Sequence, residues 1–242
     1  HSAVDVGVFK HDEGGVATQL QRHFFHGGGR LRHEDTAHFG GAGEADVAHH
    51  VAGAQHLADG DAVVGVGGIG ANAIQGARLA GAKRIIAIDP IEFKREKAME
   101  FGATHTAASM TDAVALLQEV TWGTMANKVI LTMGVGSGAL MAEAMALASK
   151  RGRVVVTNIH PAMEMGVTMN LLDVTLMEKQ VVGSLFGSGN PRADIPKLAG
   201  LYREGQLDLD GLVTRTYSLE GVNDGYEAMR AGENIRGVLV YE

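Results

Sequence analysis

Residues 61–90, DAVVGVGGIGANAIQGARLAGAKRIIAIDP, constrain the fold of this chain most strongly. A β-branched run at 62–64 is followed by the pattern Gly65-x-Gly67-x-x-Gly70, a helical stretch, a second apolar run and Asp89. This order predicts a strand, a glycine turn, a helix and a second strand, the unit that binds dinucleotides. One glycine permits the tight turn, one lets the backbone approach a pyrophosphate, and one lets the helix pack closely on the sheet.

The predicted helix, from about Gly68 to Ala80, points its unpaired N–H groups at the phosphates. Asp89 is expected at the tip of the second strand, where it would accept hydrogen bonds from the adenosine ribose and repel a 2′-phosphate, which favours NAD over NADP. In a chain with 34 glycines the pattern alone could be only a turn, and Asp89 alone could be only the solvated end of a strand. Their spacing favours the dinucleotide site.

The residues after 90 continue to alternate between apolar strand-like runs and helical patterns. Strands are expected at 83–88, 104–106, 129–133, 153–157 and 181–186, and helices at 92–101, from 111, at 138–149, 171–179 and 191–204. The alternation predicts an α/β fold with a Rossmann, doubly wound six-stranded parallel sheet. A helix at 219–232 and a strand at 237–241 are also expected, but the six strands of the sheet are already complete before them. We therefore expect residues 61–205 to form an NAD-binding domain and residues 206–242 a C-terminal helix-strand extension.

Residues 1–60 differ from the rest in composition. They hold nine of the eleven histidines and no Ile, Met, Pro, Tyr or Trp. Without sustained periodicity they are expected to form a poorly structured N-terminal arm. Their histidines and carboxylates could surround a metal, although no spacing matches a known ligand pattern. The alternative is a stretch of gene read in the wrong frame.

Charge, hydropathy and cysteine content exclude several classes of protein. The net charge of −7 provides no basic footprint for nucleic acid, and no apolar run reaches the length of a membrane span. We found no signal-peptide pattern and expect a cytoplasmic protein. The absence of cysteine excludes disulfides and cysteine-ligated metal sites.

Residues 61–242 resemble the nucleotide-binding domain and C-terminal segment of the zinc-type medium-chain alcohol dehydrogenases. The blocks VGVGGIGANAIQGARLAGA and IDPIEFKREKAMEFGATH are most similar to those of the nitrosoaniline-dependent, or nicotinoprotein, alcohol dehydrogenases. The resemblance implies an NAD-dependent oxidoreductase that converts a small alcohol to an aldehyde. It also implies a bound zinc and a homo-oligomer formed through the edge strand at Val181 to Phe186.

The same resemblance assigns roles to thirteen residues. It implies that the pyrophosphate lies on Gly65, Gly67, Gly68, Ile69 and Gly70, that Asp89 and Lys94 serve the adenosine ribose, that Thr157, Asn158 and Ile159 lie beside the nicotinamide, that Leu185 and Phe186 close over its ribose, and that Arg236 reaches the phosphates. No catalytic or metal-ligating residue is assigned. His160, just after the predicted fifth strand, is expected to be a solvent-facing loop residue.

The chain departs from the family in two ways. It has no cysteine for the family's zinc sites, and only three residues separate Asp61 from Gly65 where five are usual. Our leading interpretation is the NAD-binding part of an alcohol dehydrogenase without its catalytic zinc domain. The alternative is a non-catalytic dinucleotide-binding or oligomerisation module. A short-chain dehydrogenase is disfavoured because no tyrosine has a lysine four residues later.

Overall fold

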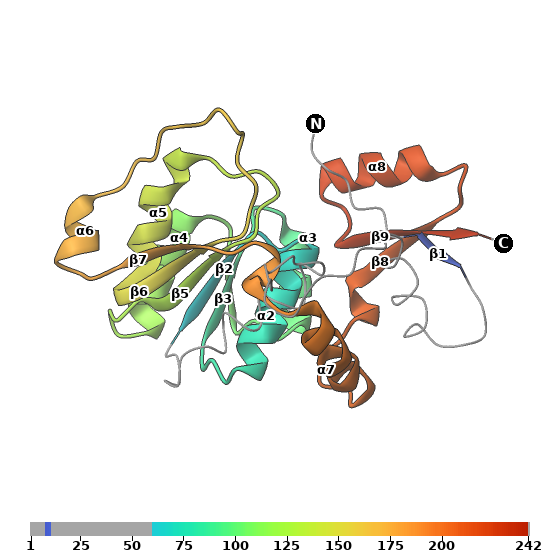
Figure 1. Ribbon diagram of the computed structural model, residues 1–242, viewed down its shortest axis with the longest axis horizontal. Helices are drawn as coiled ribbons and strands as arrows, with labels where there is room; N and C mark the ends of the chain where they lie inside the picture. The colour runs from blue at the N-terminus through green and yellow to red at the C-terminus, as the bar shows by residue number, and fades with distance from the viewer. Residues whose placement is uncertain (1–7, 11–59, 242) are drawn as a thin grey trace, which may run out of the picture.

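The computed structural model of the chain describes residues 8–10 and 60–241 (Figure 1). Its larger sheet has six strands in the order β4-β3-β2-β5-β6-β7, and every neighbouring pair is parallel. The strands are β2 (Asp61–Val64), β3 (Ile85–Ile88), β4 (His105–Ala107), β5 (Ala126–Leu131), β6 (Ala148–Val156) and β7 (Gln180–Gly183). The predicted six-stranded parallel sheet is confirmed.

Helices cover both faces of this sheet (Figure 1). On one face Val63 packs in a cluster with Ile74 of α2 (Gly68–Leu79) and with Phe101, which ends α3 (Glu92–Glu100). On the other face Val64 packs in a cluster with Leu117 of α4 (Met110–Val120) and Met145 of α5 (Met141–Leu147). Since successive strand residues point to opposite faces, burial of both faces explains why these strands are continuously apolar.

Two predicted helices end earlier than expected. The helix expected at 138–149 is a 3-10 turn, η2 (Gly138–Leu140), followed by α5, and its last residues already belong to β6. The helix expected at 171–179 is α6 (Leu171–Thr175). It stops because the chain turns at Glu178, which has a φ of 51°, and because the Lys179 N–H donates back to the Asp173 carbonyl. These ends depend on turn geometry, which periodicity does not encode.

The sixth strand is also shorter than predicted. The Ser184 N–H makes a last hydrogen bond to the Val156 carbonyl. Beyond it Phe186, Gly187 and Ser188 have positive φ values of 47°, 69° and 60°, which no strand can contain. The prediction of a strand over 181–186 is therefore wrong at its end, and residues 186–188 form the 3-10 turn η3 (Phe186–Ser188).

The C-terminal part forms a second, smaller sheet in the order β1-β9-β8 (Figure 1). After α7 (Pro191–Arg203) and η4 (Asp210–Leu212) come β8 (Val213–Tyr217), α8 (Val222–Ala231) and β9 (Arg236–Tyr241). The predicted helix and final strand are confirmed. Strand β8 was not predicted, and neither was β1 (Val8–Lys10), which lies in the segment expected to be poorly structured. Residues 1–7 and 11–59 of that segment lie outside the described residues.

Helix α2 supports the C-terminal part as well as the sheet. Gln75, only 1% exposed, exchanges two hydrogen bonds with the backbone of Asp208: its Nε2 donates to the carbonyl at 2.9 Å and its Oε1 accepts from the N–H at 2.7 Å. An amide that satisfies both groups of one peptide fixes the position of that peptide. In the part of the chain that is described, no helix is long and apolar enough to cross a membrane.

A buried carboxyl lies at the amino end of the central strand. Asp61 is 0% exposed, and neither of its carboxylate oxygens has a hydrogen-bond partner. It lies opposite Lys128 in β5, which in turn lies opposite Arg153 in β6. Burial raises the pKa of Asp61 to about 6, and the positive charge of Lys128 offsets that effect only in part. Burial also lowers the pKa of Lys128.

This carboxyl predicts stability that falls as pH rises. The folded chain holds the Asp61 proton up to about pH 6, whereas an unfolded carboxyl releases it near pH 3.8. Between these pH values the unfolded carboxyl is ionised while the folded one still holds its proton, so the free energy of unfolding falls as pH rises. The loss persists at higher pH. We expect Asp61→Asn to raise the free energy of unfolding by about 3 kcal/mol at pH 7.5 and by less than about 1 kcal/mol at pH 4.

Urea unfolding followed by circular dichroism at both pH values measures the difference. An equal effect of Asp61→Asn at pH 4 and pH 7.5 would contradict the argument. The control variant is Asp224→Asn, at an exposed carboxylate. Asp112 is unsuitable as a control because its side chain accepts a hydrogen bond from Ser109, the N-cap of α4.

Candidate functional site

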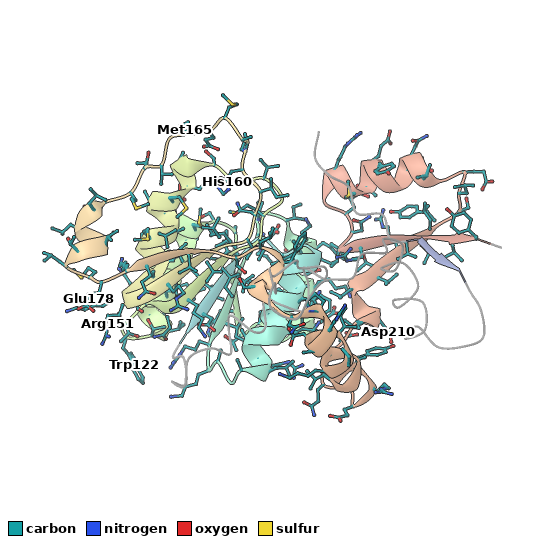
Figure 2. The ribbon with its side chains drawn as sticks, in the orientation of Figure 1. Trp122, Arg151, His160, Met165, Glu178 and Asp210 are labelled. Atoms are coloured by element: carbon teal, nitrogen blue, oxygen red, sulfur yellow. The ribbon has the colours of Figure 1, made fainter. Side chains whose placement is uncertain are left out.

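The carboxyl ends of five strands are aligned. Ile88, Val64, Leu131, Val156 and Gly183 pair in one continuous register across the sheet. The residues that follow them therefore lie along one edge: Asp89, Gly65, Thr132, Thr157 and Ser184. Figure 2 shows His160 and Met165 at this end of the sheet and Trp122, Arg151 and Glu178 at the opposite end. In open α/β sheets, ligands bind at the carboxyl edge.

The glycine loop packs against the end of β5. Gly65 has a φ of 92°, and a Cβ there would lie 2.8 Å from the backbone nitrogen of Met133. A Cβ at Gly70 would overlap the carbonyl oxygen of Gly65. The Thr132 hydroxyl donates to the Val64 and Gly65 carbonyls. Gly65 and Gly70 thus meet the steric demands that the sequence pattern predicts.

The N-terminus of α2 opens onto this loop. Its N-cap, Gly67, offers no side chain to cap the helix, and the first turn holds no acidic residue. Gly68 and Ile69 form that first turn and are half-buried. Nothing lies within 4 Å of where a Cβ on Gly67 would be. Free helix N–H groups beside an open approach form an anion site.

Asp89 is part of the loop rather than a solvated strand end. It is only 5% exposed. Its Oδ2 accepts the Val66 N–H at 2.8 Å, and its Oδ1 accepts the Ile91 N–H at 2.9 Å. Arg95 donates through one nitrogen to the Asp89 and Pro90 carbonyls, both at 2.8 Å. Each carboxylate oxygen has two lone pairs, so each can accept one more hydrogen bond.

Two cations reach this region from different elements. The guanidinium of Arg236, at the start of β9, lies directly over Gly68: its Nε and Nη2 are each 2.9 Å from where a Cβ on Gly68 would be. Lys94 in α3 is half-buried, and its Nζ lies 3.5 Å from the corresponding point on Gly232, the C-cap of α8. The C-terminal segment therefore brings positive charge to the start of α2.

The remaining predicted site residues follow β6 and β7. The Thr157 hydroxyl donates to the Leu131 carbonyl at 2.7 Å, so it holds two strands together. Asn158 is partly buried and Ile159 is 70% exposed. Leu185 is 73% and Phe186 46% exposed in the turn after β7. These five residues lie at the same sheet edge as the glycine loop, two or three strands away from it.

Glu164 is a site-forming residue that the sequence analysis missed. Its carboxylate accepts from the Gly138 N–H at 2.7 Å and from the Ser137 hydroxyl at 3.0 Å, which joins the loop after β6 to the loop after β5. The same two hydrogen bonds, first that from Gly138, lower the pKa of this exposed carboxyl. The contact joins residues far apart in the sequence, and nothing in the local sequence around Glu164 signals it.

The described residues also bear on metal binding. Among residues 8–10 and 60–241, no three His, Asp or Glu side chains converge on a point where they could hold a metal ion. The ring Nδ1 of His105 is hydrogen-bonded to Thr104 at 2.8 Å. The described side chains therefore do not form a zinc site.

Comparison with known proteins identifies the family. Residues 68–204 match the family described as zinc-binding dehydrogenase. The chain is 47% identical over 190 residues to the NDMA-dependent alcohol dehydrogenase of Amycolatopsis methanolica, covering 78% of this chain and 51% of that protein. It is 46% identical over 180 residues to alcohol dehydrogenase B of Mycobacterium tuberculosis, covering 74% and 48%.

Solved structures agree with these sequence matches. Benzyl alcohol dehydrogenase from Acinetobacter calcoaceticus superposes with a TM-score of 0.70 at 26% identity, covering 81% of this chain and 54% of that one. This chain thus spans about half the length of the curated relatives it matches. The aligned carboxyl edge, the glycine loop and these matches together show that the chain belongs to the zinc-binding dehydrogenase family of medium-chain alcohol dehydrogenases.

Proposed function

We propose that this chain binds NAD and is the cofactor-binding part of an alcohol dehydrogenase. The proposal rests on the position of the Arg236 guanidinium over Gly68, at the start of α2, where no side chain caps the helix. The guanidinium and the free helix N–H groups converge where a diphosphate would be held from two sides. Three curated relatives or structural neighbours named above carry alcohol dehydrogenase in their names.

Each element of the site has a distinct task in this proposal. The backbone of residues 65–70 holds the pyrophosphate, and Arg236 neutralises it. Asp89 uses its remaining lone pairs for the adenosine ribose and repels a 2′-phosphate. Lys94, five residues further along the chain, assists there. A bound NAD would supply the hydride acceptor for oxidation of an alcohol to an aldehyde, with the hydroxyl proton released to solvent. Leu185 and Phe186 would keep water from the nicotinamide ring.

The proposal separates cofactor binding from alcohol activation. The chain has no cysteine, and its described residues offer no cluster of three metal-binding side chains. Ligands for a zinc ion would have to come from elsewhere. We therefore expect the described residues to bind NAD without supplying the zinc site that activates a primary alcohol. The alternative function, a non-catalytic dinucleotide-binding module, shares this expectation for the isolated chain.

Calorimetric titration of the 242-residue chain with NAD, NADP and ADP-ribose tests the proposal. NAD and ADP-ribose should bind, and NADP should bind more weakly because Asp89 faces its 2′-phosphate. Gly67→Ala should weaken NAD binding about tenfold or more, because its methyl group occupies the open approach to the helix N-terminus. Its melting temperature should be unchanged, since Gly67 has an ordinary φ of −96° and open space beside it.

Gly70→Ala is the matched control for a purely structural glycine. Its Cβ would overlap the Gly65 carbonyl, so we expect a loss of about 3 kcal/mol in the free energy of unfolding. If Gly67→Ala retains full affinity for NAD, or if it lowers the melting temperature as much as Gly70→Ala does, the assignment of Gly67 to the pyrophosphate site is wrong.

We also propose that the outer side of β7 joins two copies of this chain. β7 is the last strand of the six-stranded sheet, and Val181 on it is 41% exposed. Beside it, Leu171 of α6 is 71% exposed, and Leu176, the C-cap of that helix, is 64% exposed. Lys179 holds α6 from the inner side, where its Nζ contacts Asp173 at 3.3 Å and the Met145 carbonyl at 2.8 Å. An edge that no described strand pairs with, beside such an apolar surface, suits a second copy.

Val181→Lys should shift the chain from dimer to monomer in sedimentation velocity, because a charge on the edge strand opposes pairing. Val213→Lys is the matched control, since Val213 is also 41% exposed and lies on β8, the edge strand of the smaller sheet. It should leave the sedimentation coefficient unchanged. A wild-type chain that is monomeric at all concentrations, or equal effects of the two variants, would contradict the proposal.

A further inference from the structure

The first residue of β9, Arg236, is joined to β8 by an irregular pairing. Val213 lies opposite Arg236, and Arg215 lies opposite Gly237. Two residues of β8 thus span what one residue of β9 spans, and Thr214 is the extra residue of a β-bulge. A bulge interrupts the ladder of backbone hydrogen bonds and re-aims a side chain, and bulges are frequent beside functional sites. The irregularity therefore lies directly beside the arginine assigned to the diphosphate.

The Thr214 side chain bonds to the backbone of β9 at this bulge. Its hydroxyl accepts the Ile235 N–H at 2.9 Å and donates to the Arg236 carbonyl at 3.3 Å. A hydroxyl group can accept and donate at the same time, so one side chain binds the backbone both before and after the Cα of Arg236. The point from which the Arg236 side chain starts is thereby fixed to β8.

The starts of both strands are anchored to the core around α2. Leu212, just before β8, and Ile235, just before β9, are buried in the cluster that contains Ile74 of α2. Because the helix and the two strand starts share one core, the position of Arg236 relative to the start of α2 depends on how β9 pairs with β8 at its first residue. Thr214 supplies that pairing, and the guanidinium lies over Gly68.

We propose that Thr214 is a positioning residue of the diphosphate site, whose hydroxyl holds the Arg236 backbone so that the guanidinium lies over Gly68. The inference rests on the proposed NAD binding. Arginine has a long side chain that loses rotamer freedom when it binds phosphate oxygens, and a fixed backbone reduces the conformational freedom that remains to be lost. Such preorganisation raises the affinity for the ligand without adding a contact to it. Thr214 acts in this way through Arg236 alone.

A double-mutant cycle on the 242-residue chain, measured by calorimetry with ADP-ribose, tests the proposal. Thr214→Val and Thr214→Ala both remove the hydroxyl, and each should weaken ADP-ribose binding about fivefold in the wild-type background. Arg236→Gln should weaken it about tenfold or more. In the Arg236→Gln background the Thr214 variants should cause less than about a twofold further loss, because the residue that Thr214 positions is gone. Thr214→Ser, which keeps the hydroxyl, should bind ADP-ribose as the wild type does.

Thr216→Val, at the exposed threonine two residues further along β8, is the matched control and should leave the affinity for ADP-ribose unchanged. Equal losses from Thr214→Val in both backgrounds would overturn the inference, because the hydroxyl would then act independently of Arg236. Full affinity in both hydroxyl-free variants would also overturn it, because the two hydrogen bonds would then serve only the stability of the sheet. Either result leaves the proposed function intact if the wild type binds NAD. A wild type that binds neither NAD nor ADP-ribose would remove the proposed function and this inference together.

Discussion

The contact between Gly70 and the carbonyl oxygen of Gly65 sets the direction of α2, and most of the site depends on that direction. With no Cβ in the way, the helix starts directly above the end of β2 and points its free N–H groups at the sheet edge. The same helix holds the Asp208 peptide through Gln75. This contact fixes the start of the C-terminal segment, which later returns Arg236 to Gly68.

Two buried carboxyls on neighbouring strands show how differently the two ends of the sheet are built. Asp89 accepts two backbone N–H groups, so its charge is compensated by the loop it organises. Burial raises the pKa of Asp61, at the other end, and the charge and backbone of Lys128 on the next strand offset that effect only in part. A buried carboxylate whose charge is compensated by hydrogen bonds can take part in a binding site, whereas an uncompensated one lowers the free energy of unfolding.

The sequence predicted the sheet and the glycine loop because both depend on local signals. Apolar runs identify strands buried on two faces, and a glycine pattern identifies a backbone that cannot carry a Cβ. Strand β8 was not predicted because its sequence, Val-Thr-Arg-Thr-Tyr, contains polar Thr and Arg residues and no apolar run that would indicate its pairing with β9. The end of β7 and the contact of Glu164 with Gly138 escaped because positive φ values and long-range hydrogen bonds fix them.

The sheet edge changes character from one end to the other. Around Asp89 and Gly65 it is tightly packed, and Arg236 lies over Gly68 at the start of α2. Beyond β6 it holds an unpaired amide oxygen at Asn158 and exposed apolar side chains at Ile159, Leu185 and Phe186. In the proposed function, a flat ring bound at this end of the edge would leave its outer face open to water. Hydride transfer needs that face covered by a surface that also polarises the alcohol, and in our proposal that surface is the part to be supplied from outside the described residues.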